Sequence, residues 1–156
     1  MRTQYFTTNP SQTQKLGEIL AKEILKTNPQ KRAFVVGLEG DLGGGKTTFL
    51  QGFAKGLGIK EKILSPTFVI MKKFRIRVDS CSDSYGFVYF YHIDCYRIKK
   101  PKEILGLKFK EIINNPKNIV VIEWSDRIRQ ILPKDTPILK FKFIDKNQRE
   151  ILIRNV

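Results

Sequence analysis

The chain has 156 residues, of which 41% are hydrophobic, so it can bury the core of one domain, and we expect residues 1–156 to form a single domain. No apolar run approaches the roughly 20 residues of a membrane-spanning helix, and two cysteines do not make a disulfide framework, so we expect a cytoplasmic protein without a membrane anchor. The net charge of +14 would attract a polyanion such as RNA, but no aromatic-basic RNA-binding signature accompanies the scattered lysines.

The first part of the chain predicts a helix, a buried strand and a second helix. Residues 10–26 carry apolar side chains at helical spacing, with Asn9 as the expected N-cap and Pro10 in the first turn. Residues 33–38 form a short apolar run that ends in glycines, which is typical of a buried parallel strand. A second helix is expected from residue 46 to about residue 56.

The rest of the chain continues the alternation of strand and helix patterns. Residues 67–78 and 87–93 are rich in branched and aromatic side chains and predict two strands joined by a polar loop. Residues 101–114 predict a helix, and residues 118–122 predict a second buried strand. A short helix and a two-stranded hairpin are expected over residues 126–132, 138–144 and 150–154. This order predicts an α/β fold, a three-layer sandwich whose mainly parallel central sheet has helices on both faces.

A glycine-rich segment between the first strand and the second helix matches the P-loop pattern G-x-x-x-x-G-K-[ST]. Its residues are Gly40, Asp41, Leu42, Gly43, Gly44, Gly45, Lys46 and Thr47. Such a loop lets backbone N–H groups and the positive end of the following helix face a phosphate. Lys46 would reach the β- and γ-phosphates, Thr47 would be a magnesium ligand, and Thr48 would donate near the α-phosphate. The segment predicts a site for ATP or ADP with Mg²⁺ in a fold of the P-loop NTPase type.

Two acidic residues at the ends of predicted strands are candidates for the chemistry. Glu123 follows a buried strand, where a carboxylate is costly unless a cation or a donor meets it, so we expect it to be a magnesium-side ligand. Asp94 could polarise the attacking water or hold magnesium through a water, and Arg97 could stabilise charge or anchor the loop. The only histidine, His92, is expected to be structural, and without a second histidine or a close cysteine pair we expect no zinc site.

Four motifs occur together in a fixed order. They are residues 40–48, Ser65-Pro66-Thr67-Phe68, His92-Ile93-Asp94-Cys95-Tyr96-Arg97 and Ile122-Glu123-Trp124. In this combination the chain resembles the TsaE family of ATPases, which serve bacterial synthesis of threonylcarbamoyladenosine in tRNA. The resemblance spans residues 34–127 and is far more specific than the P-loop alone.

The resemblance implies a Mg²⁺-dependent ATPase, weak alone, that partners the TsaB–TsaD complex. That complex transfers a threonylcarbamoyl group to the adenosine beside the tRNA anticodon, and ATP hydrolysis would reset it between rounds. Thr47 and Glu123 would hold magnesium, Thr67 and Asp94 would sense the γ-phosphate or its water, and Trp124 would lie near the nucleotide. Contact with tRNA is expected to be indirect, although the charge of +14 is compatible with direct contact.

Three features depart from the family pattern. Gly44 stands where alanine is common, which should loosen the loop, and Cys95 stands where an aliphatic residue is usual. Residues 79–86 look longer than typical and leave the partner contacts of this region open.

Two other functions remain compatible with the P-loop. The first is a small kinase acting on a nucleoside or metabolite, but no helical lid pattern surrounds Arg75 and Arg77. The second is a non-catalytic switch that responds to nucleotide, which the sequence does not separate from an ATPase.

Overall fold

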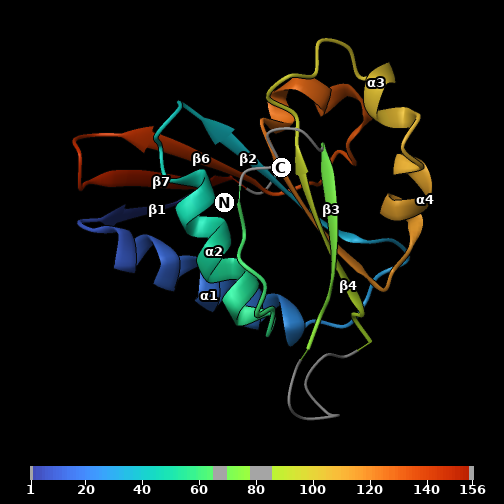
Figure 1. The fold of residues 1–156 in the computed structure, drawn as a ribbon, viewed down its shortest axis with the longest axis horizontal. Helices are drawn as coiled ribbons and strands as arrows, with labels where there is room; N and C mark the ends of the chain where they lie inside the picture. Colours follow the sequence, from blue (N-terminus) through green and yellow to red (C-terminus); the bar gives the residue numbers. More distant parts are fainter. Residues whose placement is uncertain (1, 65–69, 78–85, 155–156) are drawn as a thin grey trace.

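The computed structural model describes residues 2–64, 70–77 and 86–154 (Figure 1). Within these residues, seven strands form one sheet in the order β1-β7-β6-β2-β5-β4-β3. The strands are β1 (Arg2–Thr7), β2 (Phe34–Gly40), β3 (Met71–Arg75), β4 (Tyr89–Asp94), β5 (Asn118–Glu123), β6 (Ile138–Phe143) and β7 (Arg149–Arg154). The helices are α1 (Pro10–Leu25), α2 (Lys46–Gly56), α3 (Lys102–Leu105), α4 (Phe109–Asn114) and the 3₁₀ helix η1 (Ser125–Ile131).

Helices cover both faces of the sheet because its central strands bury alternate side chains on opposite sides. Val36 of β2 and Val121 of β5 belong to the core under α1 and α2, which lie side by side in Figure 1. Val35 and Val120 belong to the core under α3, α4 and η1. The predicted α/β architecture with helices on both faces is confirmed.

The strand directions bring the ends of β2, β4 and β5 to one edge. Strand β2 is parallel to both β5 and β6, and β4 is parallel to β5, whereas β1, β3 and β7 pair antiparallel with their neighbours. Leu38 and Asp94 both align with Glu123. The loop that leaves β2 therefore starts beside two acidic residues that are distant in sequence.

The local signals at the start of α1 act as expected. The Asn9 side chain accepts a hydrogen bond of 2.9 Å from the backbone N–H of Gln12, and Pro10 is the first helical residue. Helix α2 begins at Lys46 and ends at Gly56, as predicted. The predicted hairpin near the C-terminus is also confirmed as β6 and β7.

The single helix predicted over residues 101–114 is wrong. Two short helices, α3 and α4, replace it, and between them Lys108 adopts a left-handed backbone conformation with φ 59°. Gly106 lowers the helix propensity at the break. The turn allows Ile104 on one side and Phe109 on the other to be buried in the same core, which a continuous helix would not do.

Strand β1 was not expected, and β3 is shorter than the predicted strand. Of the residues of β1, only Thr7 is buried, so its sequence lacks the alternation that predicts a half-buried strand. It is held by antiparallel pairing with β7. Strand β3 covers Met71–Arg75 of the predicted range, and residues 67–69 lie outside the described part of the chain. Within the described ranges, no helix has the length and apolar character to span a bilayer.

Candidate functional site

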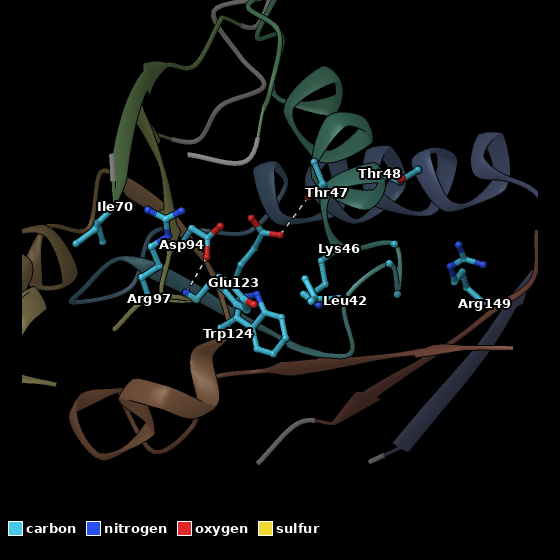
Figure 2. A pocket seen from close by; sticks show the side chains of 14 residues that line it. Leu42, Lys46, Thr47, Thr48, Ile70, Asp94, Arg97, Glu123, Trp124 and Arg149 are labelled. Atoms are coloured by element: carbon cyan, nitrogen blue, oxygen red, sulfur yellow. Dashed lines mark hydrogen bonds between the residues drawn. The ribbon is translucent and has the colours of Figure 1, made fainter. Parts of the chain in front are cut away.

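A pocket of about 660 Å³ opens around the loop between β2 and α2 (Figure 2). Its walls are the loop itself, the ends of β4 and β5 with the residues that follow them, and the start of β7. The lining residues are Leu42, Gly43, Gly44, Gly45, Lys46, Thr47, Thr48, Ile70, Asp94, Tyr96, Arg97, Glu123, Trp124 and Arg149. The pocket gathers most of the predicted site residues from three separate parts of the chain.

The loop has the geometry of an anion site. Gly43 and Gly45 have φ values of 73° and 98°, which side-chain-bearing residues rarely adopt. Gly45 precedes α2 as its N-cap residue and, being a glycine, has no side chain to cap the first N–H groups of that helix. These uncapped donors, together with the positive end of the helix dipole, fit a phosphate group.

Gly44 lies in a close turn of this loop. Its backbone N–H donates to the Asp41 carbonyl at 3.1 Å, and a Cβ at Gly44 would lie 2.9 Å from that same oxygen. It would also lie 3.2 Å from the Cβ of Phe141. The glycine therefore allows a close turn that an alanine would have to widen.

Lys46 is held inside the loop. Its Nζ donates to the carbonyls of Gly40 at 2.8 Å and Asp41 at 2.7 Å, and it lies 4.3 Å from the centre of the Trp124 ring. Burial lowers the pKa of Lys46, while the nearby carboxylates, chiefly Glu123, act in the opposite direction. An ammonium group in this position meets an anion at the mouth of the loop.

The two predicted magnesium ligands lie next to each other. The Thr47 hydroxyl donates to Glu123 Oε1 at 3.4 Å, and Glu123 is only 2% exposed (Figure 2). A hydroxyl and a carboxylate are oxygen ligands of the kind that Mg²⁺ prefers. Among the described residues, no group of three or more His, Cys, Asp or Glu could hold a metal. The Thr47 hydroxyl and the Glu123 carboxylate fit an ion that takes its other ligands from phosphate and water, as Mg²⁺ does.

Asp94 enters the pocket from the end of β4. Its carboxylate accepts a hydrogen bond of 2.9 Å from the backbone N–H of Tyr96, which shapes the turn after the strand. The neighbouring Cys95 points into the core, where burial raises the pKa of its thiol to about 12. Cys95 is thus a buried core residue. Arg97 lines the pocket on the same side as Asp94 (Figure 2).

Trp124 turns the chain sharply after β5. It has a left-handed backbone conformation, with φ 57°, which is unusual for a bulky residue. The turn brings the indole against Lys46 and within 5.1 Å of the Tyr96 ring. Trp124 therefore forms one wall of the pocket beside the loop lysine.

An ion pair between the buried Glu39 carboxylate and the exposed Arg129 side chain holds the segment that follows Trp124. Glu39, the last residue of β2 before Gly40, is 4% exposed and accepts hydrogen bonds from Arg129 and, at 3.3 Å, from the Ser125 hydroxyl. The pair with Glu39 raises the pKa of Arg129. Because both donors belong to η1, this contact ties the helix after Trp124 to the strand that enters the loop.

Two residues of the site were missed by the sequence analysis. His92 Nε2 lies 2.8 Å from Glu123 Oε2, and the imidazole is fully buried. Arg149 lines the pocket on the side away from Asp94 and Arg97 (Figure 2). For His92, its place two residues before Asp94, on the same face of a strand, was an available signal. No motif marks Arg149. Thr67, the remaining predicted residue, lies outside the described residues.

Comparison with known proteins agrees with this geometry. The model of the family described as threonylcarbamoyl adenosine biosynthesis protein TsaE matches residues 7–151. The chain belongs to the TsaE family. The family match extends beyond the P-loop to include the ends of β4 and β5 and the start of β7.

Individual TsaE proteins match most of the chain. The tRNA threonylcarbamoyladenosine biosynthesis protein TsaE of Bacillus subtilis is 34% identical over 145 residues, covering 93% of this chain and 80% of the relative. The protein of the same name from Nostoc sp. is 37% identical over 129 residues, covering 81% of this chain and 70% of the relative. The crystal structure of Bacillus subtilis YdiB is 31% identical, with a TM-score of 0.74, and the match covers 100% of this chain and 86% of that one. The predicted fold of the P-loop NTPase type is confirmed.

Proposed function

We propose that this chain is a Mg²⁺-dependent ATPase that acts in threonylcarbamoylation of the tRNA adenosine next to the anticodon. It sustains turnover of the TsaB–TsaD complex and does not itself transfer the threonylcarbamoyl group. The observation that carries the proposal is the convergence of Lys46, Thr47 and Glu123 on the uncapped start of α2. The names of its TsaE relatives place those proteins in tRNA threonylcarbamoyladenosine biosynthesis, which supports the choice of pathway.

Each residue of the pocket has a role in this proposal that follows from its position. The glycine loop and Lys46 bind the β- and γ-phosphates of ATP, and Thr48 donates near the α-phosphate. Thr47 and Glu123 hold Mg²⁺, which when bound neutralises charge on the phosphate oxygens. Asp94, together with Thr67, orients the attacking water. Trp124 covers the nucleotide side of the loop.

The proposal is tested by reconstituting tRNA modification with TsaB and TsaD in the presence and absence of this chain. We expect modified tRNA to accumulate beyond one product per TsaB–TsaD complex only when both the chain and ATP are present. Equal accumulation without the chain would contradict the proposal. If phosphate release stays at background in the presence of TsaB, TsaD and tRNA, the chain does not hydrolyse ATP there. That result would favour a non-catalytic nucleotide switch.

A kinase function has no comparable support. Arg75, on β3, contacts the Tyr89 ring at 5.9 Å from its centre. It does not line the pocket, so it is not placed as a lid arginine over a nucleotide. Incubation with ATP and a panel of nucleosides should therefore give no phosphorylated acceptor.

Replacing Arg149 with alanine is expected to weaken ADP binding about 10-fold, which corresponds to roughly 1.4 kcal/mol. Its side chain lines the pocket beside Gly45, so it adds positive charge to the side of the loop where Thr48 lies. Calorimetric titration with ADP measures the change. Lys142→Ala is the matched control, because it removes a positive charge from the same hairpin at a side chain that is 72% exposed and outside the pocket. Equal affinities for the two variants would remove Arg149 from the site.

A further inference from the structure

We propose that His92 is a positioning residue that orients the Glu123 carboxylate toward the Thr47 hydroxyl. The inference rests on the proposed function, in which Glu123 and Thr47 hold Mg²⁺. It gives the only histidine of the chain a role in metal binding through Glu123, without direct contact with the metal or the nucleotide.

The sheet places the two residues on the same face. Val121 and Glu123 alternate with residues of the opposite core, and Val121 belongs to the core under α1 and α2. On the neighbouring strand, Phe90 belongs to that core as well, so His92 and Asp94 follow it on the same face. Helix α2 covers this face, and its first turn carries Thr47. Glu123 therefore lies between β4 and the start of α2.

The two carboxylate oxygens of Glu123 have different partners. Oε2 lies 2.8 Å from His92 Nε2, and Oε1 lies 3.4 Å from the Thr47 hydroxyl. The first contact has the length of a good hydrogen bond, whereas the second is longer than a typical O–H···O bond. The imidazole thus fixes one oxygen and turns the other toward the position where a cation between Thr47 and the phosphates would bind.

Burial makes the imidazole donor necessary. The side chains of His92 and Glu123 are 0% and 3% exposed, so water does not replace a lost donor at Oε2. A buried carboxylate oxygen without a donor is costly, so the group would rotate to find one. That rotation would turn Oε1 away from Thr47.

The hydrogen-bonding pattern of the ring favours the same role. Among the described residues, His92 Nδ1 is buried without a hydrogen-bond partner, so the bond to Glu123 is the polar contact that the ring makes there. Since a carboxylate oxygen can only accept a hydrogen bond, the ring nitrogen Nε2 is the donor in this contact. A residue that only filled space at this position would gain nothing from a polar ring.

The experiment compares variants that keep or remove the donor. His92→Gln keeps an N–H group of similar reach, whereas His92→Leu and His92→Phe remove it. ADP affinity is measured by calorimetry with Mg²⁺ and with a chelator, beside the melting temperature of each variant. In the chelator, we expect the ADP affinity of every variant to stay within about twofold of the original. In the donor-free variants, the gain in affinity on adding Mg²⁺ should fall about 10-fold. A loss of this size is typical when a residue that hydrogen-bonds to a metal ligand is removed. His92→Gln should recover most of that gain.

A double variant separates positioning from packing. In a Glu123→Gln background, His92→Leu should cause no further loss of Mg²⁺ dependence, because both changes act through one carboxylate. If the donor-free variants kept their Mg²⁺ dependence while Glu123→Gln lost it, the positioning role of His92 would be overturned. The magnesium role of Glu123 would stand. An equal loss of Mg²⁺ dependence in His92→Gln and His92→Leu would also overturn the positioning role. His92 would then be a packing residue. If Glu123→Gln itself kept full Mg²⁺ dependence, both this inference and the magnesium role of Glu123 would fall. Should His92→Leu fail to fold, His92→Phe supplies the donor-free comparison.

Discussion

Replacing Lys46 with alanine is expected to weaken binding of ATP and ADP about 100-fold. The Nζ of Lys46 already makes two hydrogen bonds within the loop, to the carbonyls of Gly40 and Asp41, so it is positioned at the phosphate end before any ligand binds. Charge-assisted hydrogen bonds from a buried ammonium contribute roughly 1.5–3 kcal/mol each, and the loss of one or two accounts for an effect of this size. Calorimetric titration with ADP, with and without Mg²⁺, measures the loss.

The matched control for Lys46→Ala is Lys55→Ala on the same helix. The Lys55 side chain, in the last turn of α2, is 76% exposed, lies 3.7 Å from Glu18 and is outside the pocket. Its removal should leave nucleotide affinity within about twofold, because an exposed charge is screened by water and salt. A melting temperature for each variant separates loss of the ligand contact from loss of the loop. Affinity in Lys46→Ala equal to that of the control would argue that the loop does not bind phosphate.

Replacing Glu123 with glutamine is expected to lower Mg²⁺-dependent ATP hydrolysis about 100-fold while nucleotide binding in a chelator changes little. The substitution keeps the shape of the side chain and its ability to hydrogen bond with His92 and Thr47, but it removes the negative charge that a cation requires. A loss of this size corresponds to roughly 2.7 kcal/mol of transition-state stabilisation. Phosphate release in the presence of TsaB, TsaD and tRNA is the measurement, over a range of Mg²⁺ concentrations.

Glu103→Gln serves as the control for Glu123→Gln. The Glu103 carboxylate accepts hydrogen bonds from the backbone N–H groups of Lys99 and Lys100, and these bonds lower its pKa, but it lies outside the pocket. Its turnover should match that of the original chain. Turnover in Glu123→Gln at the level of this control would remove Glu123 from the mechanism.

Much of the fold could be predicted from the sequence because its signals are local. Asn9 and Pro10 mark the start of α1, and the glycines after β2 mark the loop. The break at Lys108 and the strand β1 were not predicted, since both depend on contacts made elsewhere. Helices α3 and α4 separate so that Ile104 and Phe109 reach one core, and β1 exists because β7 offers it an edge.

In the candidate site, too, residues of one local segment could be predicted from the sequence, whereas contacts between distant segments could not. Lys46 and Thr47 could be predicted as phosphate-site residues because they belong to one contiguous loop with the spacing of the P-loop motif. Glu123 and Asp94 could be nominated as strand-end acids, but their alignment depends on the parallel pairing of β4 with β5. The catalytic and metal roles assigned to them, and to Thr67, stay predictions.

By itself, the sequence determined the residues of the P-loop motif and the family to which the chain belongs, because these follow from short segments and their order. Only the tertiary structure decided that His92 meets Glu123, that Arg149 reaches the loop from the C-terminal hairpin, and that Gly44 lies close to Asp41 and Phe141. Contacts of this kind depend on sheet order and strand register, which bring together residues as far apart as 45 and 149. A short-range sequence pattern does not show which distant residues the sheet brings together.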